Sequence, residues 1–145
     1  MQSMNDAASK LNGLLKGEIS AVETYNQAID AVKDPAITSV LQDNRSCHAD
    51  RAQVLTEKIV AMGGKPAQDS GVWGAISKIA EGGAKTFGEK SAIGVLEEGE
   101  DKGLDQYRKL AEDDDPAVRT VAQTLIDRQE GTHRKMSELK HELGS

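Results

Sequence analysis

Two stretches decide the fold: GEISAVETY at residues 17–25 and GEDKGLDQY at residues 99–107. Each begins with Gly-Glu and ends with a Tyr seven positions after the Glu, and each leads into an Asp-Pro turn. The repeat predicts two copies of one helical hairpin. In both copies the Glu, Glu18 or Glu100, lies on an otherwise apolar helix stripe. A carboxylate there is costly unless something neutralises it, so these two residues point to function.

Composition agrees with an all-α protein formed by a single domain over residues 1–145. Aromatic residues make up only 3% of the chain and charged residues 29%, which favours helices over sheets. The formal net charge of −6 and the lack of a basic cluster argue against nucleic-acid binding. The N-terminus lacks a signal-peptide pattern, and no apolar run approaches the ~20 residues of a membrane span. A single cysteine, Cys47, makes a reducing cytoplasm the expected location.

Apolar residues at helical spacing predict four long helices, over about 5–33, 35–62, 89–112 and 116–144. Asp34 is expected to cap the second helix, with Pro35 at its first position, where the missing N–H costs nothing. Gly63 and Gly64 are expected to end that helix.

About 25 residues, 63–88, separate the second helix from the third. A hairpin would need only a few residues, whereas this length can traverse a bundle whose helices are ~40 Å long. We therefore expect the second and third helices to be parallel, joined by a long crossover. The apolar spacing of Val72 or Trp73, Ile76, Ile79 and Phe87 predicts a short helix laid across the bundle. Trp73 and Phe87 are expected to cover one face of the bundle.

Carboxylates and histidines on the predicted inner stripes suggest a metal centre. A di-metal site in a four-helix bundle takes one Glu from each of two helices and a Glu-x-x-His pair from each of the other two. Here the first and third helices supply Glu18 and Glu100, and the fourth supplies Glu130 and His133. Counted from the Asp-Pro turns, these residues fall near one level of the bundle.

The second helix supplies His48, but Arg45 stands three residues before it, where the second paired Glu is expected. Five of the six ligand positions are thus filled, and the sixth has the wrong charge. Glu97, one turn before Glu100, could replace the missing ligand. Carboxylates with neutral imidazole suit iron, manganese or zinc.

A metal-free interpretation is also open. Two unit charges 4 Å apart repel by about 4 kcal/mol at an effective dielectric of 20. Several carboxylates in one core therefore need compensation, either from a metal or from Arg45 together with the tyrosine hydroxyls. Arg is well shaped to bridge two carboxylates. The carboxylates concerned are Glu18, Glu97, Glu100 and Glu130.

The chain resembles small bacterial ferritin-like proteins classed as a domain of unknown function, and more distantly rubrerythrins and bacterioferritins. The resemblance covers nearly the whole chain and rests on the Gly-Glu…Tyr stretches, both Asp-Pro turns, and the Met-Gly-Gly at 62–64 with the Ser-Gly at 70–71. It implies a ferritin-like four-helix bundle that binds two Fe or Mn ions and reacts with oxygen or peroxide. Carried over by position, it implies six metal ligands: Glu18, His48, Glu97, Glu100, Glu130 and His133.

Two functions follow as hypotheses. The first is a metal-binding protein, an Fe or Mn oxidase or peroxidase, with an atypical carboxylate–histidine site in the bundle core. The alternative is a metal-free structural or stress-related interaction bundle in which Arg45 neutralises the buried carboxylates. The expected partners are a second copy of the chain and a small oxidant, with no nucleic acid and no membrane.

Overall fold

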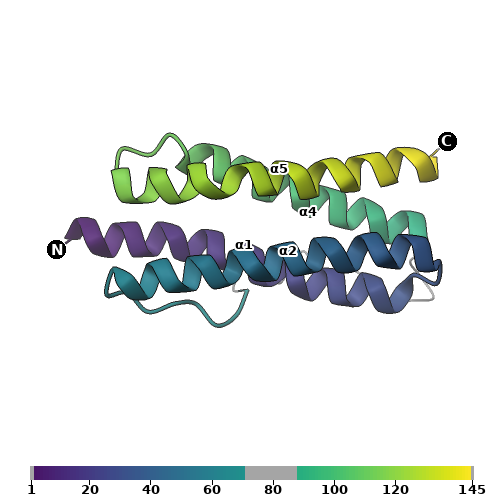
Figure 1. Cartoon of the computed structure of the whole chain (residues 1–145), viewed down its shortest axis with the longest axis horizontal. Coiled ribbons are helices and arrows are strands. Elements are labelled where there is room, and N and C mark those ends of the chain that lie inside the picture. Colours follow the sequence, from purple (N-terminus) through teal and green to yellow (C-terminus); the bar gives the residue numbers. More distant parts are fainter. Residues whose placement is uncertain (1, 71–87, 145) are drawn as a thin grey trace.

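The computed structural model describes residues 2–70 and 88–144, which contain four long helices (Figure 1). These are α1 (Gln2–Ala31), α2 (Pro35–Ala61), α4 (Glu89–Leu110) and α5 (Pro116–Gly144). They pack side by side as a four-helix bundle, as predicted. The predicted short helix of the crossover lies outside the described residues.

The chain forms two antiparallel hairpins, α1–α2 and α4–α5. Figure 1 shows that α2 and α4 run in the same direction, opposite to α1 and α5, which confirms the parallel arrangement expected from the crossover length. The crossover first turns back along α1, where Asn12 binds it through two hydrogen bonds. Asn12 Nδ2 donates to the Lys65 carbonyl at 2.9 Å, and the Ala67 N–H donates to Asn12 Oδ1 at 2.8 Å.

Local sequence explains where the helices of each hairpin begin and end. Asp34 caps α2 by accepting a hydrogen bond from the Ala36 N–H at 2.9 Å, and Asp115 accepts one from the Ala117 N–H at the start of α5 in the same way. At the end of α2, Gly63 adopts a left-handed φ of 81°, which costs glycine little. The N–H groups of the two glycines then reach back to carbonyls of the last turn, so the predicted end of the helix is confirmed.

The bundle interior contains two apolar clusters separated by a polar layer. One cluster packs residues 7–15 of α1 against the C-terminal part of α2 and the start of α5. The other packs residues 25–32 of α1 against the start of α2, the start of α4 and the later part of α5. Between them lie buried polar side chains from all four helices: Glu18, Asn44, His48, Arg51, Glu100, Gln129 and Thr132. None of the described helices is long and apolar enough to cross a membrane.

Candidate functional site

His48 stands at the centre of the polar layer, between two carboxylates from different helices. Its Nδ1 lies 2.5 Å from Glu18 Oε1, and its Nε2 lies 2.7 Å from Glu100 Oε2. All three side chains are buried. Because each ring nitrogen faces a carboxylate oxygen, the ring is arranged as an imidazolium that donates to both. The predicted convergence of Glu18, His48 and Glu100 inside the bundle is confirmed.

Arg51, one turn after His48 on α2, brings a second positive charge into the layer. Its Nε donates to Glu18 Oε2 at 2.6 Å, and its Nη2 donates to Gln129 Oε1 on α5 at 2.7 Å. The residue is 0% exposed, and a fully buried guanidinium is rare unless it is paired. Two carboxylates and two cations therefore balance, and the layer carries no net charge.

Hydroxyl and amide groups complete the hydrogen bonding of the carboxylates. Tyr25 donates to Glu100 Oε2 at 2.5 Å, and Tyr107 donates to Glu18 Oε2 at 2.6 Å. Thr132 donates to Glu100 Oε1 at 2.8 Å. Each carboxylate thus receives hydrogen bonds from at least two helices other than its own, which links the two hairpins.

These contacts control the ionisation of the layer. Burial raises the pKa of Glu18, but the charges and hydrogen bonds of His48 and Arg51 outweigh it and lower the pKa from 4.5 to about 2. Burial opposes the charge of His48, yet Glu100 and Glu18 raise its pKa from 6.5 to about 9. The pKa of Glu100 is lowered because the charge of His48 outweighs burial. All three groups are therefore ionised at neutral pH.

The buried layer does not fit a pair of metal ions. On α2, two residues three positions apart face the layer, His48 and Arg51. On α5, the corresponding two residues are Gln129 and Thr132. Neither pair contains a carboxylate, and a guanidinium has no lone pair to offer a cation. Added metal ions would also face two protein cations that already neutralise the available carboxylates.

Two expectations about the inner stripes are wrong, because on both helices the buried stripe passes one residue before the expected position. Arg45 does not neutralise the buried carboxylates; its Nη1 donates to Asn26 Oδ1 at 2.8 Å near the surface, and Arg51 contacts Glu18 instead. On α5, the buried face carries Gln129 and Thr132 rather than Glu130 and His133. A helical stripe can continue by three or by four residues, so both registers satisfy the same periodicity.

Sequence reasoning therefore missed four residues of the layer. For α5 a signal existed, because the stripe through its buried Leu125 and Leu139 is more apolar than the one chosen, and it passes through both missed positions. For α2 the sequence signal was weaker, because both possible stripes contain an arginine: Arg45 in the expected stripe and Arg51 in the observed one. The missed residues are Asn44, Arg51, Gln129 and Thr132.

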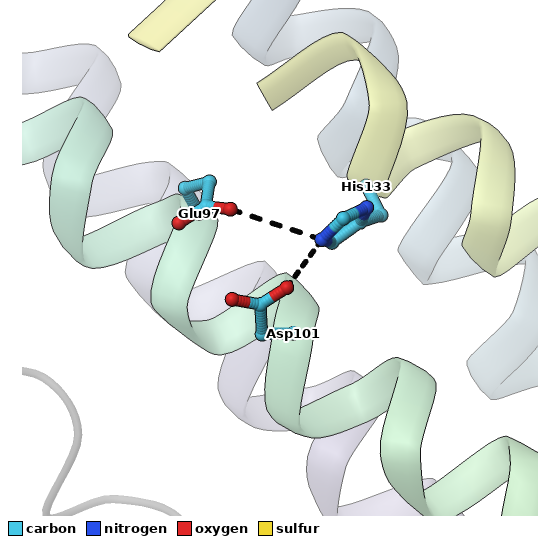
Figure 2. A group of neighbouring side chains, drawn as sticks. All are labelled: Glu97, Asp101 and His133. Carbon is cyan, nitrogen blue, oxygen red and sulfur yellow. Dashed lines mark hydrogen bonds and ion pairs between the residues drawn. The ribbon is translucent and has the colours of Figure 1, made fainter. Parts of the chain in front are cut away.

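The remaining predicted ligands lie on the outer side of the α4–α5 pair. Glu97 and Asp101, one turn apart on α4, point toward His133 of α5 (Figure 2). His133 Nε2 lies 3.8 Å from Glu97 Oε2 and forms a hydrogen bond with Asp101 Oδ1. One ligand atom from each residue lies within 4.8 Å of the others. The half-buried Glu130 lies beside this surface cluster, in a groove that Asp101 and His133 also line.

The surface cluster differs from the buried layer in access and in charge balance. The side chains of Glu97, His133 and Asp101 are 16%, 24% and 57% exposed. Lys140 Nζ lies 3.3 Å from Glu97 Oε1, so one carboxylate already has a protein counter-charge. Carboxylate oxygen and imidazole nitrogen are ligands that iron, manganese and zinc accept, and the exposed side of the cluster is open to an ion from solvent.

A narrow cavity lies against the buried layer between α1 and α4. Its volume is about 40 Å³, and its walls include Gly99, Gly103 and Ala21 as well as the inner residues Glu18 and Glu100. Sites for drug-sized ligands usually measure roughly 300–1,000 Å³, so the cavity admits water-sized molecules rather than an organic substrate.

The family model described as a domain of unknown function, DUF2383, matches residues 6–113. This range covers most of α1, all of α2 and α4, and every charged residue of the buried layer. None of the curated proteins matches the chain.

Proposed function

We propose that this chain, which belongs to the family of the domain of unknown function DUF2383, binds a divalent metal ion at Glu97, Asp101 and His133. The observation that carries the proposal is the convergence of one imidazole and two carboxylates, with their ligand atoms within 4.8 Å of one another. Two of these residues, Glu97 and His133, are among the metal ligands predicted from the sequence.

The arrangement of the surface cluster supports a single ion. Glu97 and Asp101 lie one turn apart on α4, a spacing that lets two side chains on one helix face bind the same ion. His133 completes the set from the neighbouring helix. Three protein ligands leave coordination positions for water or for a small oxidant such as oxygen or peroxide. We expect iron or manganese, since one imidazole with two carboxylates suits both ions.

Lys140 competes with the metal in this proposal. Its ammonium group neutralises Glu97 in the absence of an ion, and a bound cation would take over that role. The variant Lys140→Gln is therefore expected to bind metal more tightly than the native chain. A weaker affinity in this variant would argue against Glu97 as a ligand.

Titration with Co²⁺, followed by calorimetry and by its visible absorption bands, tests the site. We expect one Co²⁺ per native chain and loss of binding in His133→Ala. His141→Ala, on the same helix, is the matched control and should bind as the native chain does. Asp101→Asn should weaken binding, whereas Asp105→Asn, one turn further along α4, should not. Binding that survives His133→Ala would contradict the proposal.

A metal-free structural or stress-related interaction bundle is the second candidate. The observation that favours it is the charge balance of the buried layer, in which Arg51 takes the role first assigned to Arg45. This candidate predicts that the native chain binds no stoichiometric Co²⁺, Mn²⁺ or Fe²⁺ and that none of these ions raises its melting temperature. Light scattering of the same samples would test the predicted homodimer.

A further inference from the structure

We propose that positions 48, 51, 129 and 132 decide whether this bundle core holds protein cations or metal ions, and that the native residues make the layer a metal-excluding, fixed-charge counterpart of a di-metal centre. In this view His48 and Arg51 supply the two positive charges that Glu18 and Glu100 require. The inference is independent of the surface cluster.

The internal repeat shows that the four positions form two equivalent pairs. His48 lies 13 residues after Pro35, and Gln129 lies 13 residues after Pro116. Arg51 and Thr132 each lie 16 residues after the same prolines. Each helix thus presents two inward residues three apart, which is the spacing of the Glu-x-x-His pairs in carboxylate-bridged di-metal bundles. The backbone register of such a centre is present, with different residue types on it.

The glutamates occupy equivalent places in the other two helices. Glu18 and Glu100 each precede a tyrosine by seven residues, and their carboxylates contact the two different nitrogens of the same imidazole ring. A di-metal bundle takes its two unpaired Glu ligands from the corresponding helices. Only the residues on α2 and α5 therefore separate this layer from a complete ligand set.

Arg51 connects α1 and α5 across the layer. Its guanidinium spans from Glu18 on α1 to Gln129 on α5, at 2.6 and 2.7 Å, and its Nη2 also approaches Thr132 Oγ1 at 3.4 Å. Gln129 extends this connection to Glu100, because its Nε2 donates to Glu100 Oε1 at 3.0 Å. The guanidinium and its partners thus link the two carboxylates through protein atoms.

Charge balance assigns the second cation to His48. Nη2 of Arg51 lies 2.6 Å from His48 Nδ1, so a neutral ring could accept a hydrogen bond from the guanidinium. With a neutral ring, however, the lone pair of Nδ1 would lie 2.5 Å from Glu18 Oε1. The buried layer would then carry a net charge of −1. An imidazolium instead donates to both carboxylates and makes the layer neutral, which a buried site strongly favours. The two hydrogens of Arg51 Nη2 then point to Gln129 Oε1 at 2.7 Å and Glu18 Oε1 at 3.4 Å.

The test exchanges the four positions together. One variant carries His48→Glu, Arg51→His, Gln129→Glu and Thr132→His in a His133→Ala background, so the surface cluster cannot contribute. We expect it to bind two Co²⁺ per chain, whereas the His133→Ala chain with the native layer binds none. Adding Glu18→Gln and Glu100→Gln to the four-position variant should abolish the binding. This comparison holds whether or not the native chain binds metal at its surface.

Circular dichroism covers the case in which the variant does not fold alone. The exchange buries four carboxylates with only two imidazoles to offset them, so helicity that appears only on addition of Co²⁺ would support the inference. A variant that folds but takes up no Co²⁺, or one that stays unfolded with Co²⁺, would overturn it. So would Co²⁺ binding by the native layer in the His133→Ala chain that Glu100→Gln removes.

Discussion

The hydroxyl of Tyr25 donates to Glu100, 2.5 Å away on a helix of the other hairpin, and Tyr107 returns the same contact to Glu18 at 2.6 Å. Each copy of the repeated stretch therefore stabilises the carboxylate of the other copy. The exchange explains why a Gly-Glu…Tyr stretch occurs twice. One copy alone would leave its tyrosine hydroxyl without a carboxylate acceptor and its carboxylate without one of its donors.

Removal of the buried guanidinium should destabilise the bundle strongly. Arg51→Met leaves Glu18 without one of its two counter-charges, and an uncompensated buried charge of this kind typically costs about 3–5 kcal/mol. Arg45→Met, one and a half turns away, removes a donor to Asn26 rather than to a carboxylate of the layer, and should cost below about 1 kcal/mol. Urea denaturation of both variants measures the difference. Equal losses would mean that Arg51 does not neutralise the layer.

The two tyrosines should stay protonated until the protein unfolds. Burial and the neighbouring carboxylates, Glu100 for Tyr25 and Glu18 for Tyr107, raise both pKa values well above 10. The chain contains only two tyrosines, so the whole tyrosinate absorbance should appear together with the loss of helical circular dichroism during an alkaline titration. Tyrosinate absorbance that rises while the helices persist would contradict the buried contacts.

The substitutions Tyr25→Phe and Tyr107→Phe should each lower the free energy of unfolding by about 1.5–3 kcal/mol, the range for hydrogen bonds to charged groups.

Two glycines of the second repeated stretch should respond to alanine in opposite directions. A Cβ at Gly103 would lie 2.8 Å from Gln129 Nε2, which donates to the carbonyl and the carboxylate of Glu100. Gly103→Ala must displace that amide and should destabilise by about 1–2 kcal/mol. Within the described residues, a Cβ at Gly99 meets no side chain or other helix within 4 Å, so Gly99→Ala should stabilise the helix by about 0.5–1 kcal/mol. Thermal unfolding of the pair checks the sign of each change.

Stability should pass through a maximum in mildly acidic solution. The folded pKa of Glu18 is lowered, so its contribution is complete above about pH 4.5 and is lost as the pH falls toward 2. The folded pKa of His48 is raised, so its contribution is complete below about pH 6.5 and is lost as the pH rises through about 9. Urea denaturation across this range measures both limbs.

The variant His48→Gln tests whether His48 causes the loss of stability at alkaline pH. It should be less stable than the native chain in mild acid and should lose less stability between pH 6.5 and 9, since the titrating ring is gone. If the native chain and the variant lost stability in parallel over this interval, His48 would not carry the alkaline limb.

The bundle and its connection could be predicted from the chain because they depend on local and periodic signals. Asp34 and Pro35 begin α2, Gly63 ends it, and the length of the crossover makes α2 and α4 parallel. The repeated Gly-Glu…Tyr stretches identified Glu18 and Glu100 as buried carboxylates in equivalent places. Each of these inferences needs only the residues near the feature and the geometry of an ideal helix.

Helix periodicity and capping are properties of neighbouring residues, so the chain alone predicts four amphipathic helices that bury acidic groups near mid-bundle. Which of two adjacent stripes faces inward depends instead on how the four helices pack together. Two stripes that differ by a step of three or four residues at one point share most of their apolar residues, and packing against the other helices selects one of them. That choice buries Arg51 and Gln129 and turns Arg45, Glu130 and His133 outward. It thereby makes the core a balanced set of protein charges and places the candidate metal ligands on the surface.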